Sequence, residues 1–225
     1  PLMSVRTPEA QGKQPVSEAI VVVDLVDSTK TTTRHGWYAV GRHVVQDLRA
    51  CIIEVGGRYG LSCRKFTGDG YMLAFSSPGD AAHAVLQALH AITAIARAVN
   101  DLNASAPQER RIRLRFALHY GEVDVVEEAR DREGPTVSYT FRLEGVDAES
   151  LKKAISPMPA ERFPSHDYAI VSERVFEMLR DDYAVAFPWE PEPIGVLPLK
   201  GFDGYHQPYL VRNLSALHLQ ASEVQ

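Results

Sequence analysis

The sequence predicts an α+β protein in which a mostly antiparallel sheet carries two main helices on one face. Three observations lead to this fold class: an apolar run of strand length at residues 19–26, two strands around a Gly-Asp-Gly turn at 68–70, and helical spacing of apolar residues across 77–102. An alternating stretch follows at 111–123. The order strand, helix, hairpin, helix, strand is typical of a ferredoxin-like split β-α-β core.

The first strand is the run AIVVVDLV, which includes Asp24 near its end. Residues 27–30, DSTK, have side chains suited to a helix N-terminus, so we expect a helix from there to about Val55. The sequence GGRYG at residues 56–60 ends that helix.

A hairpin is expected next, with one strand through Lys65 and a second in YMLAFSS at residues 71–77. Its turn is TGDG, residues 67–70, where the two glycines permit a tight reversal. Asp69 therefore lies at the tip of the hairpin. Nothing about such a turn requires an acidic residue, so Asp69 needs another explanation.

The stretch RIRLRFALHYGEV alternates between apolar and polar positions, which predicts a strand covered on one side. Arg111, Arg113 and Arg115 share its polar face. A basic patch is one interpretation of these arginines. A solvated sheet face or interface edge is favoured, because simple alternation already accounts for them.

The rest of the chain predicts a helix over 136–153, a proline-rich segment at 155–167, a strand and short helix at 168–180, and a terminal hairpin at 195–213. A chain of 225 residues is expected to form one domain. We place it at residues 18–213, between a flexible N-terminal arm at 1–17 and a C-terminal tail at 214–225. Residues 1–2 precede a methionine and are interpreted as remnants of expression.

Composition narrows the classes of function. A net charge of −5 and a pI near 5.9 provide no basic surface for nucleic acid or an anionic membrane, so neither partner is expected. The two cysteines, Cys51 and Cys63, are expected to be small core residues. With no secretory leader expected, they indicate a reducing cytoplasm rather than a disulfide framework.

Asp24 and Asp69 are predicted to meet at one end of the sheet, since the first strand of a split β-α-β core lies beside the hairpin. Two carboxylates at an open edge suit Mg²⁺, which prefers a few such ligands plus substrate phosphates. Ser28 and Thr29 open a helix whose amides could hold phosphate. Taken singly, each aspartate also suits a turn or a helix N-cap; together they favour a nucleotide site.

Five blocks of sequence carry a resemblance to a known family: VVVDLVDSTK, KFTGDGYMLAF, RFALHYGEV, DREGPTVSYTFRLEG and PLKGF. Their order and approximate spacing resemble those of class III nucleotidyl cyclase catalytic domains, over about residues 18–213. The resemblance implies a homodimer, usually head to tail, that shares each active site between chains. It also implies two Mg²⁺ or Mn²⁺ ions per site and closure of a nucleoside triphosphate to a 3′,5′-cyclic nucleotide with release of pyrophosphate.

By that resemblance, Asp24 and Asp69 are the metal ligands, with the backbone carbonyl of Leu25 as an addition. Lys65 and Asp131 occupy the two base-reading positions. The partner chain is expected to supply the base-reading and transition-state residues to each metal pair.

Three further positions match the family pattern or depart from it. Arg142 matches the arginine that neutralises charge in the transition state, and Lys200 resembles a phosphate-contacting lysine. The ribose-orienting position, commonly asparagine, is Ser138 here. Serine has a shorter side chain with one hydroxyl, so it needs a bridging water or a closer sugar to act in the same way.

The identity of the base stays open at the level of sequence. A lysine and aspartate pair is associated with adenylate cyclases, but cytosine and uracil also offer a matching donor and acceptor. A small chain with no regulatory domain and an altered ribose-orienting position resembles the pyrimidine cyclases of bacterial Pycsar anti-phage systems. That resemblance implies UTP as the leading substrate and a cyclic UMP messenger read by a separate effector. ATP is the alternative substrate, and an inactive nucleotide-binding module is the alternative of another class.

Overall fold

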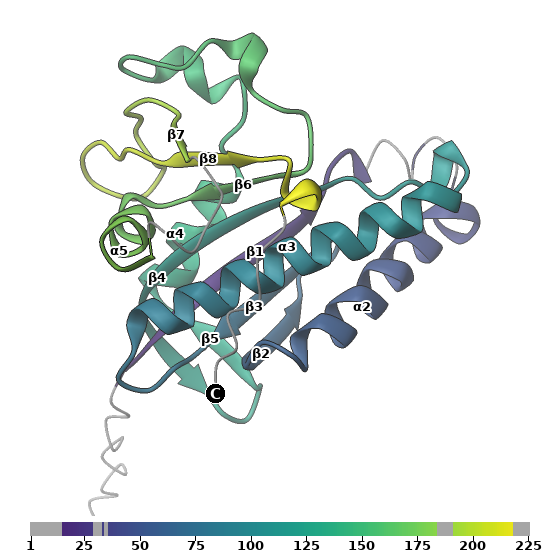
Figure 1. Ribbon diagram of the computed structural model, residues 1–225, viewed down its shortest axis with the longest axis horizontal. Helices are drawn as coiled ribbons and strands as arrows, with labels where there is room; N and C mark the ends of the chain where they lie inside the picture. The colour runs from purple at the N-terminus through teal and green to yellow at the C-terminus, as the bar shows by residue number, and fades with distance from the viewer. Residues whose placement is uncertain (1–14, 29–32, 34–35, 184–190, 218–225) are drawn as a thin grey trace, which may run out of the picture.

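The computed structural model describes residues 15–28, 33, 36–183 and 191–217. Its strands form one sheet in the order β2-β3-β1-β4-β6-β8-β7, with β5 paired to β4 (Figure 1). Among the described residues, neighbouring strands pair antiparallel except β4 with β6, which confirms the mostly antiparallel sheet. The strands are β1 Val16–Leu25, β2 Leu61–Phe66, β3 Tyr71–Phe75, β4 Leu114–Val126, β5 Asp131–Glu133, β6 Tyr168–Val171, β7 Glu192–Pro193 and β8 Tyr209–Arg212.

Helices cover the two faces of this sheet unequally. In the part of the chain that the structure describes, the longer helices are α2 Arg42–Gly56, α3 Ala81–Ser105, α4 Pro135–Glu144 and α5 Glu173–Tyr183. The two main helices, α2 and α3, pack on one face as expected, and α5 joins them there. α4 packs on the opposite face, against β4 and β1. Short helices complete the chain: η1 Trp37–Gly41, η2 Gln108–Arg110, η3 Ser150–Lys153, η4 Ala160–Arg162 and η5 Leu214–Ala216.

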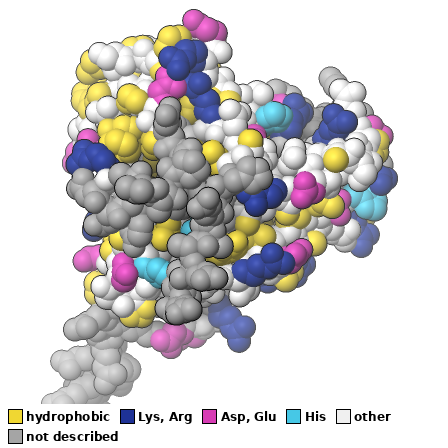
Figure 2. Space-filling model, in the orientation of Figure 1, with side chains coloured by type: hydrophobic (Ala, Val, Ile, Leu, Met, Phe, Trp, Pro, Cys, Tyr) yellow, Lys and Arg dark blue, Asp and Glu magenta, His cyan; other side chains and the backbone are white. Residues whose placement is uncertain are grey.

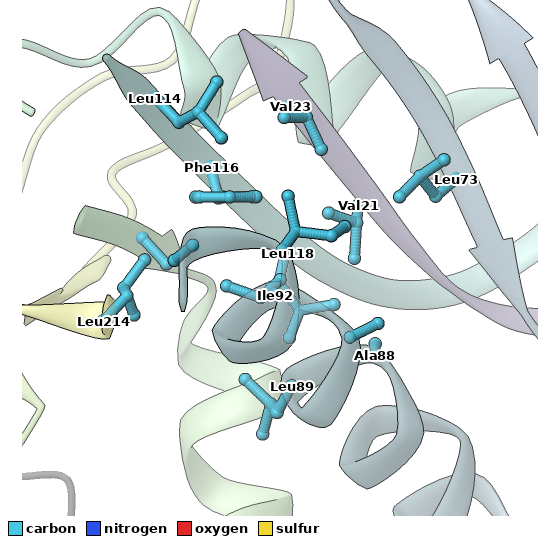
Figure 3. Packing of buried hydrophobic residues seen from close by; sticks show 14 of the residues in the cluster. Val21, Val23, Leu73, Ala88, Leu89, Ile92, Leu114, Phe116, Leu118 and Leu214 are labelled. Atoms are coloured by element: carbon cyan, nitrogen blue, oxygen red, sulfur yellow. The ribbon is translucent and has the colours of Figure 1, made fainter. Parts of the chain in front are cut away.

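The largest hydrophobic cluster lies between the sheet and α3 (Figure 3). Side chains of α3 point toward alternate residues of the central strands, and Ile92 and Leu118 are fully buried. This alternation follows from the two-residue repeat of a strand, which sends successive side chains to opposite faces. The labelled members of the cluster are Val21, Val23, Leu73, Ala88, Leu89, Ile92, Leu114, Phe116, Leu118 and Leu214.

α3 is long and apolar enough to cross a membrane by length and composition alone. In the structure, 61% of its most apolar window is buried inside the protein. The helix packs on the sheet with α2 and α5, so its apolar character is explained by its place in the core. On the face shown in Figure 2, basic and acidic side chains are interspersed rather than gathered by sign.

Several element boundaries differ from the sequence-based expectation. β1 begins at Val16, so residues 16 and 17, assigned to the flexible arm, pair with β4. At the other end, Leu214 is 1% exposed and belongs to the core, so the fold extends past residue 213. Residues 1–14 and 218–225 of the predicted arm and tail lie outside the described part.

The helix predicted over 136–153 is too long. α4 ends at Glu144, and Gly145 caps it. The Asp147 carboxylate then accepts hydrogen bonds from the backbone amide of Ser150, at 2.9 Å, and from its hydroxyl, at 3.0 Å. An aspartate that binds the backbone in this way competes with helical hydrogen bonds, which is why the chain turns here.

Both cysteines are buried and unpaired, as the sequence predicts.

Candidate functional site

Asp24 and Asp69 are brought together by the packing of the hairpin on β1. β1 and β3 pair up to Val23 and Tyr71, so the residues that follow and precede them are neighbours. A Cβ atom added to Gly70 would lie 1.9 Å from the Val23 carbonyl oxygen, and only glycine allows this approach. The hairpin tip therefore rests on the end of β1, with Asp69 beside Asp24.

The pKa of Asp24 reflects its proximity to Asp69. Burial raises the pKa of Asp24 above its usual value, and the negative charge of Asp69 adds to that increase. The hydroxyl of Ser28 donates a 2.8 Å hydrogen bond to Oδ2 of Asp69. Ser28 thus orients the carboxylate of Asp69. Leu25 is the last residue of β1, directly after Asp24, and its side chain is buried.

Arg115 and Glu144 join this pair and were not predicted as site residues. Arg115 lies opposite Asp24 in the β1–β4 register, and its Nη2 is 2.8 Å from Asp24 Oδ2. Its Nε is 2.6 Å from Glu144 Oε1. The expectation that Arg115 belongs to a solvated face is therefore wrong, since it forms two ion pairs and its side chain is only 28% exposed.

Glu144 has the most perturbed carboxyl group of the cluster. Burial, and then the negative charge of Asp24, raise the pKa of Glu144 to about 7. Asp24 and Glu144 both pair with the single guanidinium of Arg115, and Asp69 adds its negative charge to theirs. A local excess of negative charge of this kind favours a bound cation.

The donor set fits Mg²⁺ or Mn²⁺ as a partial shell. Among the described residues, no three His, Cys, Asp or Glu side chains form a ready-made metal cage. A hard cation held by Asp24 and Asp69 would complete its coordination with a backbone carbonyl, water and substrate phosphate. This incomplete shell is the arrangement expected where the substrate itself brings ligands.

Lys65 and Asp131 form an ion pair, so the structure brings together the two residues that are predicted to read the base. The Lys65 side chain is 51% exposed, whereas that of Asp131 is 9% exposed. The hydrogen bond to Asp131 raises the pKa of Lys65. Cys63 belongs to a hydrophobic cluster against which Phe141 of α4 packs. Lys65, two residues further along β2, shares the face of Cys63, so both side chains lie on the α4 side of the sheet.

α4 presents Ser138 and Arg142 outward, one helical turn apart. Thr136, Thr140 and Leu143 fill its buried face instead. This spacing explains how one short helix holds two predicted site residues on a single exposed side.

Arg142 and Lys200 line one cavity of about 420 Å³, together with Lys153. Lys200 lies in the loop that follows buried Leu199, so the terminal hairpin brings this lysine to the end of α4. Neither of the aspartates Asp24 and Asp69 lines this cavity. Asp147 and Glu149 line it too, so the cavity carries acidic as well as basic side chains.

Thr29, predicted to hold phosphate with Ser28, lies outside the residues that the structure describes.

Known proteins share this fold. No protein-family model matches the chain, and no curated protein matches it by sequence. Solved structures do match. The adenylyl cyclase CyaB from P. aeruginosa is 17% identical over 88% of this chain and 96% of that chain, with a TM-score of 0.60.

Two guanylyl cyclases give similar results. Cya2 is 17% identical over 92% of this chain and 98% of that chain, with a TM-score of 0.65. The guanylate cyclase domain of RhGC from Catenaria anguillulae, in complex with GTP, is 17% identical over 87% and 95%, with a TM-score of 0.62. The chain therefore has the fold of class III adenylyl and guanylyl cyclase catalytic domains.

Proposed function

We propose that this chain is a nucleotidyl cyclase that converts a nucleoside triphosphate to its 3′,5′-cyclic nucleotide and pyrophosphate, with UTP as the preferred substrate. The observation that carries the proposal is the meeting of Asp24 and Asp69 beside Arg115 and Glu144. Two acidic side chains from a strand end and a hairpin tip, in a fold shared with cyclases, suit a triphosphate held through metal ions.

Asp24 and Asp69 would hold Mg²⁺ or Mn²⁺, two ions per site, with the Leu25 carbonyl as a further ligand. When bound, such ions supply charge neutralisation and lower the pKa of the attacking hydroxyl. Ser28 keeps Asp69 oriented through its 2.8 Å hydrogen bond, so that carboxylate needs little reorganisation on binding.

Two basic residues of the cavity beside α4 would act on the phosphates. Arg142 neutralises charge that grows on the α-phosphoryl oxygens, and preorganised donors of this kind contribute about 10²–10³ in rate. Lys200, which lines the same cavity, contacts the polyphosphate. Ser138, one turn from Arg142, orients the ribose through its hydroxyl.

Lys65 and Asp131 would select the base. The Asp131 carboxylate accepts from a base N–H or amine, and the Lys65 ammonium donates to a neighbouring ring nitrogen or carbonyl. The choice of UTP over ATP, the second candidate, rests on the resemblance of a chain with serine at position 138 to the pyrimidine cyclases.

The exposure of Ser138 and Arg142 on α4 supports a homodimer in which each site takes metal ligands from one chain and α4 from its partner. The two unpaired cysteines suit a cytoplasmic setting. The cyclic nucleotide product would then be read by a separate effector protein in antiviral signalling.

The test is to incubate the protein with each of the four nucleoside triphosphates and Mn²⁺ or Mg²⁺, and to identify products by mass. We expect cyclic UMP as the main product and none from the Asp69→Asn variant. A dominant purine product would refute the choice of UTP. Tight binding of a triphosphate with no cyclic product under any metal would instead identify a nucleotide-binding module.

A further inference from the structure

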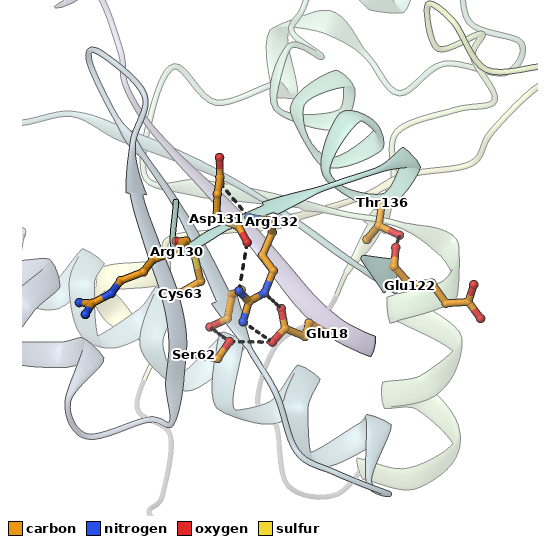
Figure 4. A network of polar contacts seen from close by, with 9 residues as sticks. Glu18, Ser62, Cys63, Glu122, Arg130, Asp131, Arg132 and Thr136 are labelled. Carbon is orange, nitrogen blue, oxygen red and sulfur yellow. Dashed lines mark hydrogen bonds and ion pairs between the residues drawn. The ribbon is translucent and has the colours of Figure 1, made fainter. Parts of the chain in front are cut away.

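A buried ion pair, formed by Glu18 and Arg132, lies next to Asp131 (Figure 4). Arg132 of β5 binds both carboxylate oxygens of Glu18 of β1, through Nε to Oε2 and through Nη2 to Oε1 at 3.0 Å. The Glu18 side chain is 2% exposed and that of Arg132 is 10% exposed. Ser62 of β2 donates a 2.9 Å hydrogen bond to the same Glu18 oxygen, Oε1. One carboxylate thereby joins three strands.

The pair also reaches Asp131. Nη1 of Arg132 donates to the backbone carbonyl of Asp131 at 3.1 Å, while the amide of Arg132 donates to Asp131 Oδ1 at 2.8 Å. Lys65 binds the other carboxylate oxygen, Oδ2. Both the backbone and the carboxylate of Asp131 are therefore fixed, and the backbone contact depends on a guanidinium held by Glu18.

Stability alone is a weak reason for this arrangement. Removing two charges from water offsets most of their mutual attraction, so apolar replacement of a buried pair is often neutral or stabilising. A planar guanidinium, by contrast, binds a carboxylate with one edge and a carbonyl with another in a fixed plane, whereas the three donors of a lysine ammonium share one nitrogen and have no fixed fork. The geometry of the pair is therefore better explained by a role in orienting Asp131 than by a contribution to the stability of the fold.

We propose that Glu18 and Arg132 are positioning residues that hold Asp131 in the orientation needed to distinguish one nucleobase from another. This inference rests on the proposed role of Lys65 and Asp131 as the base-reading pair. Neither Glu18 nor Arg132 touches the base; they act through the backbone of β5.

The test compares two variants with the wild-type protein. Arg132→Lys keeps the charge beside Glu18 but loses the contact with the Asp131 carbonyl. The double variant Glu18→Leu/Arg132→Met replaces the buried pair with apolar side chains of similar size. The control is Glu54→Leu/Arg58→Met, the same changes in an exposed pair at the C-terminal end of α2, where Glu54 of the helix and Arg58 of the following turn lie 2.7 Å apart.

The measurements are the thermal midpoint and the Kd of the α,β-methylene analogues of the four nucleoside triphosphates with Mg²⁺, by calorimetry. These analogues cannot cyclise, so binding is read without turnover. We expect the double variant to keep its thermal midpoint. In both variants, the ratio of the Kd of the second-best analogue to that of the best should fall about tenfold, because that factor corresponds to the free energy of one hydrogen bond. The control should keep the wild-type preference.

Each other outcome has a definite meaning. A folded double variant or Arg132→Lys variant with the wild-type base preference would show that the pair is merely structural and overturn the inference. Equal binding of all four analogues by the wild-type protein would overturn it too, because Asp131 would then read no base. Selective binding without cyclisation of any natural triphosphate would refute the proposed cyclase activity and leave the positioning role standing.

Discussion

Substitution of Gly70 by alanine tests whether the approach of the hairpin to β1 creates the acidic site. The new Cβ would lie 1.9 Å from the Val23 carbonyl oxygen and 3.1 Å from the Asp24 Cα. To go from 1.9 Å to the 3.4 Å of an ordinary contact, the hairpin tip must move by about 1.5 Å. Such overpacking costs about 1–3 kcal/mol of stability. A misplacement of about 1 Å at a reacting centre can reduce the rate about 10²-fold, so we expect kcat/KM to fall by at least that factor.

The control for Gly70→Ala is Gly79→Ala, at the opposite end of β3. Gly79 has φ +78°, and a Cβ atom added there would meet no heavy atom within 4 Å beyond its chain neighbours, so alanine brings backbone strain without a clash. Both variants should lose several degrees in thermal midpoint, but only Gly70→Ala should lose cyclisation, measured as product formed per unit time. A folded Gly70→Ala variant with activity within threefold of the wild type would refute the reasoning.

Three other measurements test the site and the core. Asp69→Asn should abolish turnover and leave the thermal midpoint unchanged or higher, because a carboxylate charge is lost but the shape is kept; unfolding would instead make Asp69 a structural residue. Mixing Asp69→Asn with Arg142→Ala after dissociation should restore roughly a quarter of wild-type activity, since half the dimers carry one intact site of two; no recovery despite proven exchange would refute shared sites. Burial, and then the charges of Arg174 and His206, lower the pKa of His119 to about 4. Between pH 6.5 and 4 the unfolded chain binds a proton at His119 that the folded protein does not, so stability is lost as the pH falls through this range. His119→Gln should therefore flatten the fall in thermal midpoint between these pH values, and an unchanged slope would contradict this assignment.

The parts of the fold that could be predicted are those with a local sequence pattern, such as a periodic alternation or a glycine turn. The alternation around Phe116 predicted β4, and the two-glycine turn predicted the hairpin with Asp69 at its tip. The acidic residue in that turn was a usable signal because turn geometry did not explain it. Its pairing with Asp24 followed from the order of the elements alone.

The missed site residues depend on register and packing, which one sequence does not specify. Alternation placed Arg115 on a polar face, but only the β1–β4 register puts it opposite Asp24. Glu144 reaches the same carboxylate because α4 packs on that face and ends there. β5, a strand of three residues in an acidic stretch, carries no periodic signal, so the contacts of Arg132 with Glu18 could not be predicted either.

The ion pair of Arg115 with Asp24 has a consequence for the resting protein. A guanidinium already sits beside the carboxylate that would bind a divalent ion, so the fold has its own internal counter-charge at that position. Folding is therefore expected to persist when divalent ions are scarce, and an incoming ion has to compete with an arginine that cannot lose its proton. Under the proposed function, the supply of free metal would control turnover without deciding whether the chain stays folded.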